Sequence, residues 1–292
     1  MKGETQMSAI EVRSVSKSFG RTEALKSVSA TFASGKICGF LGRNGAGKTT
    51  LLNIITNRIF ADRGQVLVDG EPAVENDQAQ SKIFYMTEQT LYPENMRVRD
   101  VFQLTLGFYP EFDLDEALRL ADRFKLDIGK KIEGLSTGYR SIFKLVLTLS
   151  AHTPIIIFDE PVMGLDANYR DLFYKELAAH YSTTPSTVIL STHLIQEAAG
   201  LLEEVVIIDE GRILLAQTAE SILQLAYTVS GDQESVDRYL AGKKVIREES
   251  LGRFKTAMIY QERNGIDQSE LARLGLDLTP ARLQELFISL TN

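Results

Sequence analysis

One glycine-rich loop constrains this chain more than any other stretch. Residues 42–49 read Gly-Arg-Asn-Gly-Ala-Gly-Lys-Thr, which fits the pattern G-x-x-x-x-G-K-[ST] of the P-loop. An apolar run of strand length, residues 37–41, comes before the loop, and residues 50–55 read as the first turns of a helix. Strand, loop and helix together predict a cradle of backbone N–H groups at a helix N-terminus, where phosphate groups bind.

The residue types in this loop suit a nucleoside triphosphate. Glycines let the backbone curl closely around phosphate because no Cβ intervenes. Lys48 can reach the terminal phosphates, and the hydroxyl of Thr49 can ligate Mg²⁺. We therefore expect the nucleotide to contact the following loop residues: Gly42, Asn44, Gly45, Ala46, Gly47, Lys48, Thr49 and Thr50.

Two carboxylates follow a second apolar run. Residues 155–158 are continuously apolar, which is typical of a strand buried on both faces of a parallel sheet, and Asp159 and Glu160 come next. Open α/β sheets bind ligands at the carboxyl ends of such strands. We predict that Asp159 holds Mg²⁺ through water and that Glu160 polarises a water for attack on the γ-phosphate. A solvated loop acid is the alternative reading of Glu160.

The order of elements predicts an α/β fold with a mainly parallel sheet, because strands and helices alternate. Strands at residues 10–15 and 24–32, joined by a turn at 16–21, indicate an N-terminal antiparallel β subdomain. Apolar residues at spacings of three and four from 98 to about 132 indicate a helical subdomain. We expect the nucleotide-binding domain to span residues 1–220, with its helical subdomain at about 90–150.

The last stretch, residues 221–292, is expected to form a separate accessory domain. It reads as a strand, a short helix, a hairpin and a final helix, at residues 226–230, 233–240, 243–260 and 280–290. That order predicts a small α+β appendage. We favour dimer stabilisation or regulation as its role over metabolite sensing, because no ligand motif is present.

Composition excludes several other classes of protein. The formal net charge is −7 and no long basic run is present, so no nucleic-acid partner is expected. Cys38 is the only cysteine, which rules out an internal disulfide. No stretch is long and apolar enough to span a bilayer, and the first residues lack the apolar core of a signal peptide. Either Met1 or Met7 fits as the native start.

The motifs together resemble those of the ATP-binding subunit of an ABC transporter. Beside the P-loop and the Asp-Glu pair, three further elements occur in the family's order: Leu-Ser-Thr-Gly-Tyr at 135–139, Gly-Leu-Asp at 164–166 and Ser-Thr-His at 191–193. The Leu-Ser-x-Gly element, called the signature loop, separates this family from other P-loop ATPases. The resemblance covers roughly residues 10–215. It implies a P-loop NTPase core that binds ATP and Mg²⁺.

The resemblance also implies roles for single residues. Phe19 occupies the place of the aromatic that stacks on adenine, and a surface aromatic is the plainer reading. Glu88 matches the position of the family's glutamine loop, which touches Mg²⁺ and the membrane subunit, and Gln89 remains open for that position. Roles across the dimer interface or at the γ-phosphate are implied for Ser136, Gly138, Asp166 and His193. His152 and His180 match no motif and are assigned to structural or surface positions.

The signature loop departs from the family pattern. Thr137 replaces a glycine and Tyr139 a glutamine, while Ser136 and Gly138 are kept. Phosphate contact is therefore still expected. We expect either slower turnover or a partner subunit whose signature loop is closer to the family pattern. In the P-loop, Arg43 replaces the family's proline, which we regard as tolerated.

The implied function is an ATP-hydrolysing subunit that dimerises around ATP and powers a separate membrane permease. Such a subunit is peripheral, at the cytoplasmic face of the cell membrane, and the helical subdomain with the Glu88 loop is where docking is expected. The C-terminal stretch resembles the tail on ATPases of ABC-2-type exporters, which favours export. The substrate, and whether the dimer has identical subunits, are left open. The rivals are a soluble ABC ATPase acting on ribosomes or DNA, a nucleotide kinase or GTPase, and a non-catalytic binding module.

Overall fold

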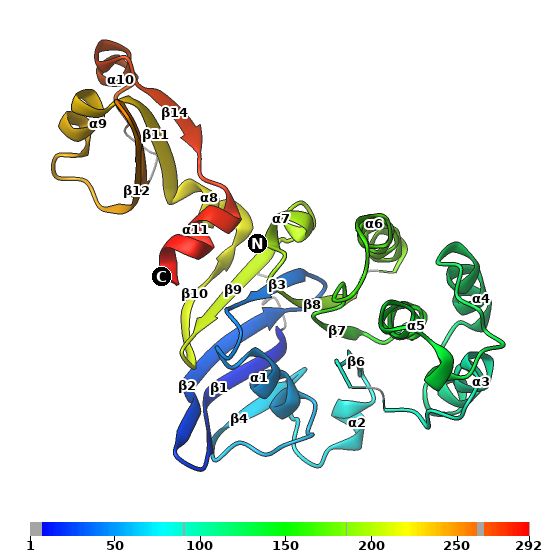
Figure 1. Cartoon of the computed structure of the whole chain (residues 1–292). Coiled ribbons are helices and arrows are strands. Elements are labelled where there is room, and N and C mark those ends of the chain that lie inside the picture. The colour runs from blue at the N-terminus through cyan, green and yellow to red at the C-terminus, as the bar shows by residue number, and fades with distance from the viewer. Residues whose placement is uncertain (1–7, 90, 185, 262–265, 292) are drawn as a thin grey trace, which may run out of the picture. The chain divides into compact units, whose positions relative to one another are not determined.

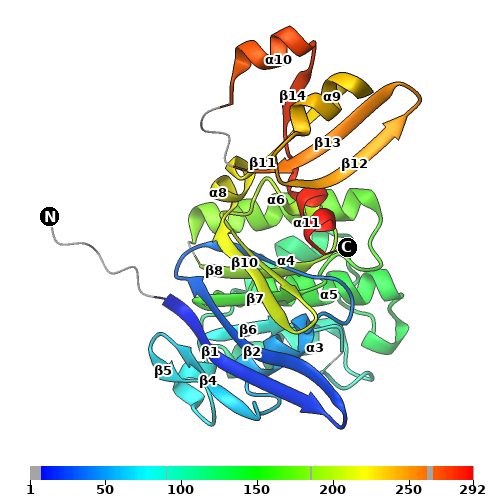
Figure 2. The ribbon, with the colours of Figure 1, turned by 90° about the vertical axis from the view of Figure 1, so that its left-hand side faces the viewer.

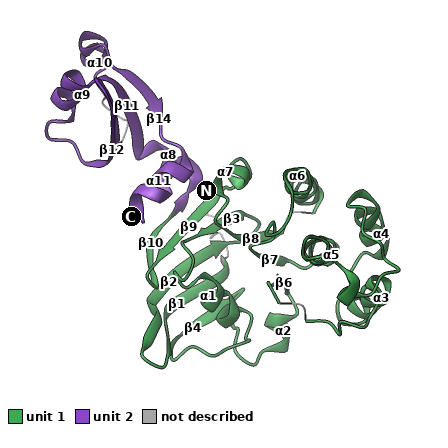
Figure 3. Ribbon diagram, in the orientation of Figure 1, with its two compact units in different colours: residues 1–216 green, residues 217–292 purple. Residues whose placement is uncertain are grey.

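The computed structural model describes residues 8–89, 91–184, 186–261 and 266–291. The chain divides into two compact units, Met1–Ala216 and Gln217–Asn292, which are described separately (Figure 3). Met7, the alternative start, lies outside the described residues. Within the described ranges no helix has both the length and the apolar composition needed to cross a membrane.

A sheet of six strands forms the centre of the first unit. Its order is β10-β9-β3-β8-β7-β6, and β9, β3, β8, β7 and β6 pair with their neighbours in parallel (Figure 1). The prediction of an α/β fold with a mainly parallel sheet is therefore confirmed. The strands are β3 Ile37–Leu41, β6 Ile83–Met86, β7 Ile155–Asp159, β8 Thr187–Thr192, β9 Glu204–Asp209 and β10 Arg212–Thr218.

One face of this sheet packs on α1 and on a second sheet, which is antiparallel. Alternate strand residues such as Phe40, Ile157 and Ile189 share one buried core with α1, Lys48–Ile55, and with the antiparallel strands. That sheet has the order β2-β1-β4-β5 (Figure 2), so the predicted antiparallel β subdomain is confirmed. Its strands are β1 Ser8–Phe19, β2 Thr22–Ala33, β4 Arg63–Val68 and β5 Glu71–Pro72.

The turn expected at residues 16–21 is shorter than predicted. Strand β1 continues to Phe19, which pairs with Thr22, so only Gly20 and Arg21 lie between the two strands. The polar run 16–18 belongs to the strand because Asp62 holds it, accepting hydrogen bonds from the Ser18 N–H at 2.7 Å and from Lys17 Nζ at 2.9 Å. Polar residues on an exposed strand resemble a turn when only the sequence is read.

Helices cover the opposite face of the central sheet. The first layer contains α5, Thr137–Leu149, and α6, Ala167–Thr183, and α3 and α4 lie beyond α5 (Figure 1). These two are α3, Val98–Phe108, and α4, Leu114–Arg123, so the helical subdomain is present. The expectation that the helical pattern reaches residue 132 is wrong for residues 109–113, which separate α3 from α4, and for residues 124–131. Lys125 has a positive φ of 54°, and the Asp127 carboxylate accepts from the Gly129 N–H at 2.9 Å, so a turn replaces the helix there.

Replacing Phe158 with alanine is expected to lower the stability of the first unit by about 3–5 kcal/mol. Its ring is fully buried at the end of β7 and packs edge-on against Phe173 of α6 at a centroid distance of 5.3 Å. Urea unfolding followed by far-UV circular dichroism measures the change, because the chain has no tryptophan for a fluorescence measurement. The matched control is Phe108→Ala, because that ring is 72% exposed and its loss should change the free energy of unfolding by less than about 0.5 kcal/mol. Equal effects of the two substitutions would contradict this packing.

The second unit is a small α+β domain around one antiparallel sheet of order β12-β13-β11-β14. Its core joins the sheet to α9 and α10 through buried residues such as Tyr227, Val236 and Leu271. The final helix starts at Leu283 and not at Pro280, because Pro280 ends a strand that pairs with Tyr227. The elements are α8 Ala219–Gln224, β11 Ala226–Asp232, α9 Gln233–Leu240, β12 Val245–Leu251, β13 Phe254–Tyr260, α10 Gln268–Leu274, β14 Asp277–Pro280 and α11 Leu283–Leu290.

Candidate functional site

The loop between β3 and α1 has the backbone geometry that its glycines predict. Gly47 caps α1 with a φ of 109°, in a region that side chains rarely enter, and no side chain caps the first turn of this helix. A Cβ at Gly42 would lie 2.5 Å from the carbonyl oxygen of Ile208. The loop is therefore pressed against β9, and its helix end keeps N–H groups available to an anion.

A cavity of about 230 Å³ opens over this loop. Eight of its lining residues come from β2, the loop and α1, and the other two are acids from the ends of other strands. The lining residues are Ala24, Arg43, Asn44, Gly45, Gly47, Lys48, Thr49, Thr50, Glu88 and Glu160. Two predicted contact residues do not line it: Gly42 is packed against Ile208, and Ala46 is buried with its carbonyl accepting from the Gly211 N–H at 3.0 Å.

Lys48 is the buried cation of this cavity. Its Nζ donates to the carbonyl oxygen of Gly42 at 2.6 Å and lies 3.8 Å from Oε1 of Glu160. Burial lowers the pKa of Lys48, and the nearby carboxylates of Glu160, Asp159 and Glu88 oppose that shift. A charged amine held inside an acidic, largely dehydrated pocket is suited to meet the negative charge of a phosphate group.

Asp159 is held by three hydroxyl groups at the end of β7. Its Oδ2 accepts from Thr49 Oγ1 at 2.8 Å and from the Tyr85 hydroxyl at 3.2 Å, and its Oδ1 accepts from Ser191 Oγ at 2.8 Å. Burial next to the Asp159 carboxylate raises the pKa of Tyr85, which keeps that phenol protonated as a donor. The loop hydroxyl and the strand-end carboxylate therefore lie together, as predicted for a site of hard oxygen ligands.

Tyr85 and Ser191 were not predicted as partners of Asp159. Ser191 lies in the Ser-Thr-His motif before His193, and Tyr85 lies three residues before Glu88. Their position explains the contact, because β6 and β8 flank β7 and bring their carboxyl ends beside it. Strand order is what the sequence pattern did not contain.

Glu160 is buried, strained and only partly paired. Its φ is +50°, and its side chain is 9% exposed. Oε2 contacts Nδ1 of His193 at 2.8 Å, whereas Oε1 has no hydrogen-bond partner among the described residues and faces Lys48. A buried carboxylate oxygen without a donor is costly, and such strain gathers at functional sites. The geometry leaves this oxygen available to a molecule in the cavity.

The structure separates Glu88 from Gln89. Glu88 lines the cavity over the glycine loop, where its carboxylate opposes the lowering of the Lys48 pKa by burial. Gln89 lines a different cavity of about 270 Å³, between β6 and the helices, together with Tyr92 and Lys144. Lys144 also donates to the backbone carbonyl of Glu88 at 2.7 Å, which fixes the course of this segment. Of the two alternatives, Glu88 is the one beside the loop.

The signature loop and Asp166 begin two neighbouring helices. Ser136 caps α5 by accepting from the Tyr139 N–H at 3.4 Å, and Asp166 caps α6 by accepting from the Tyr169 N–H at 3.0 Å. A Cβ at Gly138 would lie 2.9 Å from the carbonyl oxygen of Gly164, so only glycine fits this contact. None of Ser136, Gly138 and Asp166 is among the described residues that line the cavity over the glycine loop.

Phe19 lies outside the cavity in the same way. Its ring is 51% exposed at the end of β1, and Lys17 Nζ lies 5.6 Å from the ring centroid. The cavity is lined instead by Ala24, further along the same hairpin. The structure thus leaves the ring free to contact a planar group from solvent, and it does not bring the ring to the glycine loop.

Comparisons with known proteins agree with this geometry. Residues 25–163 match the family model described as ABC transporter. The chain is 27% identical over 286 residues to the ABC transporter ATP-binding protein YtrB of Bacillus subtilis (strain 168), covering 96% of this chain and 97% of YtrB. It is 32% identical over 223 residues to the sulfate/thiosulfate import ATP-binding protein CysA of Caulobacter vibrioides, covering 73% of this chain and 66% of CysA.

Solved structures show the same fold. The dimeric structure of a bacterial ABC transporter cassette superimposes with a TM-score of 0.65 and 22% identity, covering 72% of this chain and 98% of that one. The share of this chain that aligns is close in size to the first unit, within which the glycine loop, the Asp159 site and the signature loop lie.

Proposed function

This chain belongs to the family of ABC transporter ATP-binding subunits and is an ATPase, and on that basis we propose that two subunits close around two ATP molecules. Each site would join the glycine loop of one subunit to Ser136 and Gly138 of the other. The position of these residues supports the proposal, because the signature loop lies outside the cavity of its own chain. A second subunit would bring the N-terminus of α5, with Ser136 and Gly138, to the γ-phosphate beside the N-terminus of α1.

Within each site the reaction is the attack of water on the γ-phosphorus of ATP, which releases ADP and inorganic phosphate. Glu160 would accept a hydrogen bond from the water and orient it, and Lys48 would meet the charge on the γ-phosphate. His193 would hold the Glu160 carboxylate through its Nδ1 and sense the γ-phosphate with the rest of its ring. The observation that carries this assignment is the buried, unpartnered Oε1 of Glu160, which lies 3.8 Å from Lys48 Nζ.

Mg²⁺ fits the donor set on the other side of the same cavity. Thr49 Oγ1 and Asp159 Oδ2 already lie 2.8 Å apart, and Glu88 adds a third oxygen ligand. These are the hard oxygen donors that Mg²⁺ prefers, and Mg²⁺ keeps several of its waters. When bound, the ion would neutralise charge on the β- and γ-phosphates. We also propose that Phe19 stacks on the adenine when the nucleotide arrives.

The partner of this subunit would be an integral membrane permease encoded on another chain, which places it peripherally at the cytoplasmic face of the membrane. We propose that the permease contacts the helical subdomain and the segment around Glu88. Gln89 and Lys144 line a cavity there, next to the residue that reaches the ATP site. A permease segment in this cavity would contact Gln89, whose neighbour Glu88 lines the cavity over the glycine loop.

Export is the direction that we propose. The relative CysA, whose name includes import, aligns with 73% of this chain, whereas YtrB aligns with 96%. The second unit, Gln217–Asn292, is therefore shared with YtrB over nearly its whole length. It has the small α+β form expected of the tail on ABC-2-type exporter ATPases, and we propose that it stabilises the dimer.

Purification from native membranes in mild detergent tests the proposed function. A polytopic membrane protein is expected in near-equal amount with this chain, and a second, different ATPase in the complex would identify a heterodimer. The control is the same purification with a chain carrying Lys144→Glu, which alters the Gln89 cavity and should weaken the association. Recovery without any membrane protein would contradict the permease partner, and a co-purifying binding protein from outside the cell would contradict export.

A further inference from the structure

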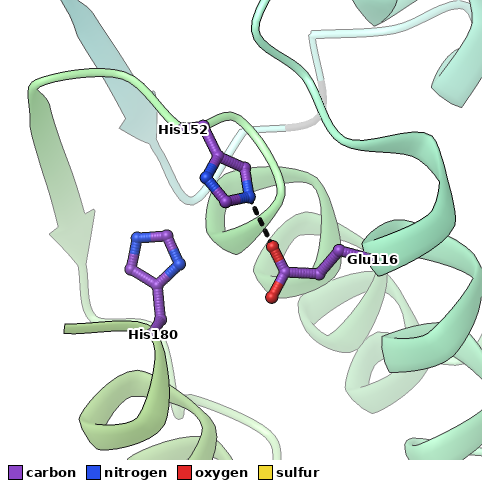
Figure 4. A group of neighbouring side chains, drawn as sticks. All are labelled: Glu116, His152 and His180. Carbon is purple, nitrogen blue, oxygen red and sulfur yellow. Dashed lines mark hydrogen bonds and ion pairs between the residues drawn. The ribbon is translucent and has the colours of Figure 1, made fainter. Parts of the chain in front are cut away.

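A second cluster of ligand-type side chains lies away from the ATP site. Glu116 of α4, His152 of the loop after α5 and His180 near the end of α6 point toward one another (Figure 4). Their ligand atoms all lie within 4.8 Å of one another, and Glu116 Oε2 contacts His152 Nε2 at 2.6 Å. The two imidazole rings are 5.2 Å apart at their centroids. They are two of the only three histidines in the chain.

Of the three residues in this cluster, His180 is the one whose position is least explained by packing in the core. Its side chain is 5% exposed, and its Nε2 has no hydrogen-bond partner among the described residues. A buried polar atom normally has a partner, so hydrogen bonding within the chain does not fully account for this imidazole. The imidazole nitrogens of histidine are common ligands of metal ions.

The surroundings of the cluster suit a cation. The helices α5 and α6 both end beside it, and the C-terminal end of a helix has partial negative charge. Two arginines lie nearby: Arg119 binds Oε1 of Glu116 at 3.1 Å, and Arg119 and Arg123 both bind the buried carboxylate of Glu176. Arg119 thus occupies one oxygen of Glu116 and leaves Oε2 for the cluster. Glu116 and His152 are partly exposed, which gives an ion a path from solvent.

We propose that Glu116, His152 and His180 form a site for Zn²⁺, with water as the fourth ligand. Two imidazole nitrogens and one carboxylate oxygen are a ligand set that Zn²⁺ accepts in tetrahedral geometry. Zinc–ligand bonds of about 2.0–2.2 Å need ligand atoms about 3.3 Å apart. Glu116 Oε2 and His152 Nε2, which are 2.6 Å apart, must therefore separate by about 0.7 Å, and pairs near the 4.8 Å limit must approach by about 1.5 Å. Rotation of the partly exposed His152 and Glu116 side chains supplies that movement.

Such an ion would join three segments that are distant in the sequence. It would tie α4 of the helical subdomain to the far ends of α5 and α6, whose first residues follow Ser136 and Asp166. The ion would therefore cross-link α4 to α5 and α6, the helices that pack on the central sheet. It does not touch the cavity over the glycine loop.

Metal binding to the purified full-length chain tests this site. After removal of metals by a chelator, Zn²⁺ is titrated in excess Mg²⁺, and Co²⁺ is used in parallel because its visible absorption reports tetrahedral coordination. We expect one Zn²⁺ per chain, a tetrahedral Co²⁺ spectrum, and a rise in Tm of roughly 5 °C when free Zn²⁺ exceeds Kd about 100-fold. His152→Gln and Glu116→Gln should each weaken binding by at least about tenfold.

The matched control is His193→Gln, which removes the third histidine and should leave Zn²⁺ affinity and the Co²⁺ spectrum unchanged. His180→Gln should abolish binding, and if that buried variant does not fold, the partly exposed His152→Gln gives the same answer. Absence of Zn²⁺ binding would overturn the proposal and leave Glu116 and His152 as a hydrogen-bonded pair. Binding that survives His152→Gln but is lost in His193→Gln would place the ion at the ATP site and equally overturn it.

Discussion

Replacing Glu160 with glutamine is expected to reduce ATP hydrolysis by about 10²–10⁴-fold while ATP binding is kept. The amide has the same shape, so it preserves packing at the end of β7, but it cannot polarise the water as a carboxylate does. The loss corresponds to about 3–5 kcal/mol in the activation barrier. Because bound ATP is then not consumed, the closed dimer should accumulate, which gel filtration with Mg²⁺ and ATP would detect.

The control for this variant is Glu71→Gln, which removes a carboxylate of the same size from the exposed strand β5, outside the cavity. Its hydrolysis rate should equal that of the unmodified chain. Normal hydrolysis by the Glu160 variant would remove this residue from the catalytic role. Loss of ATP binding along with hydrolysis would instead show that Glu160 supports the cavity through Lys48 and His193.

Mixing two inactive variants is expected to restore activity, because each site is proposed to draw on both subunits. Lys48→Met removes the cation from the glycine loop, and Gly138→Asp puts a carboxylate where a Cβ would already lie 2.9 Å from the Gly164 carbonyl oxygen. Each variant alone should lose at least about 10²-fold in kcat. About half of the dimers in an equal, randomly paired mixture combine the two variants, and one of the two sites in each of these is intact. The mixture should therefore recover about a quarter of normal activity.

The structure provides a matched control for this experiment. Lys48 and Glu160 line the same cavity of one chain, so a mixture of Lys48→Met with Glu160→Gln leaves no intact site and should show no recovery. Retained ATP binding by Gly138→Asp would show that this variant is folded. Failure of the first mixture, with both variants folded and dimeric, would contradict a composite site or show that the native dimer contains a different second subunit.

Much of the fold was predictable because its signals are local. The apolar runs before Gly42, Asp159 and His193 have strand length and end in polar residues, and the structure places all three strands side by side. Serine is a preferred N-cap residue, and Ser136 caps α5 through the Tyr139 N–H. These features depend on a few neighbouring residues, which is why a single sequence contains them.

What the sequence did not predict depends on contacts between distant segments. The hydroxyls of Tyr85 and Ser191 meet Asp159 only because β6 and β8 flank β7. His152 and His180 were assigned to structural or surface positions, since 28 residues separate them and neither lies in a motif. Their approach to Glu116 follows from how the ends of α5 and α6 meet α4, which no local pattern encodes.

The substitution of tyrosine for glutamine in the signature loop has a consequence for how the dimer opens. The Tyr139 hydroxyl lies 3.3 Å from that of Tyr169, and Gly138 is pressed against the Gly164 carbonyl. The tips of α5 and α6 are thus fastened to each other by a bond and by a close backbone contact. In the proposed dimer, Ser136 and Asp166 would therefore leave the partner subunit together once the γ-phosphate is gone.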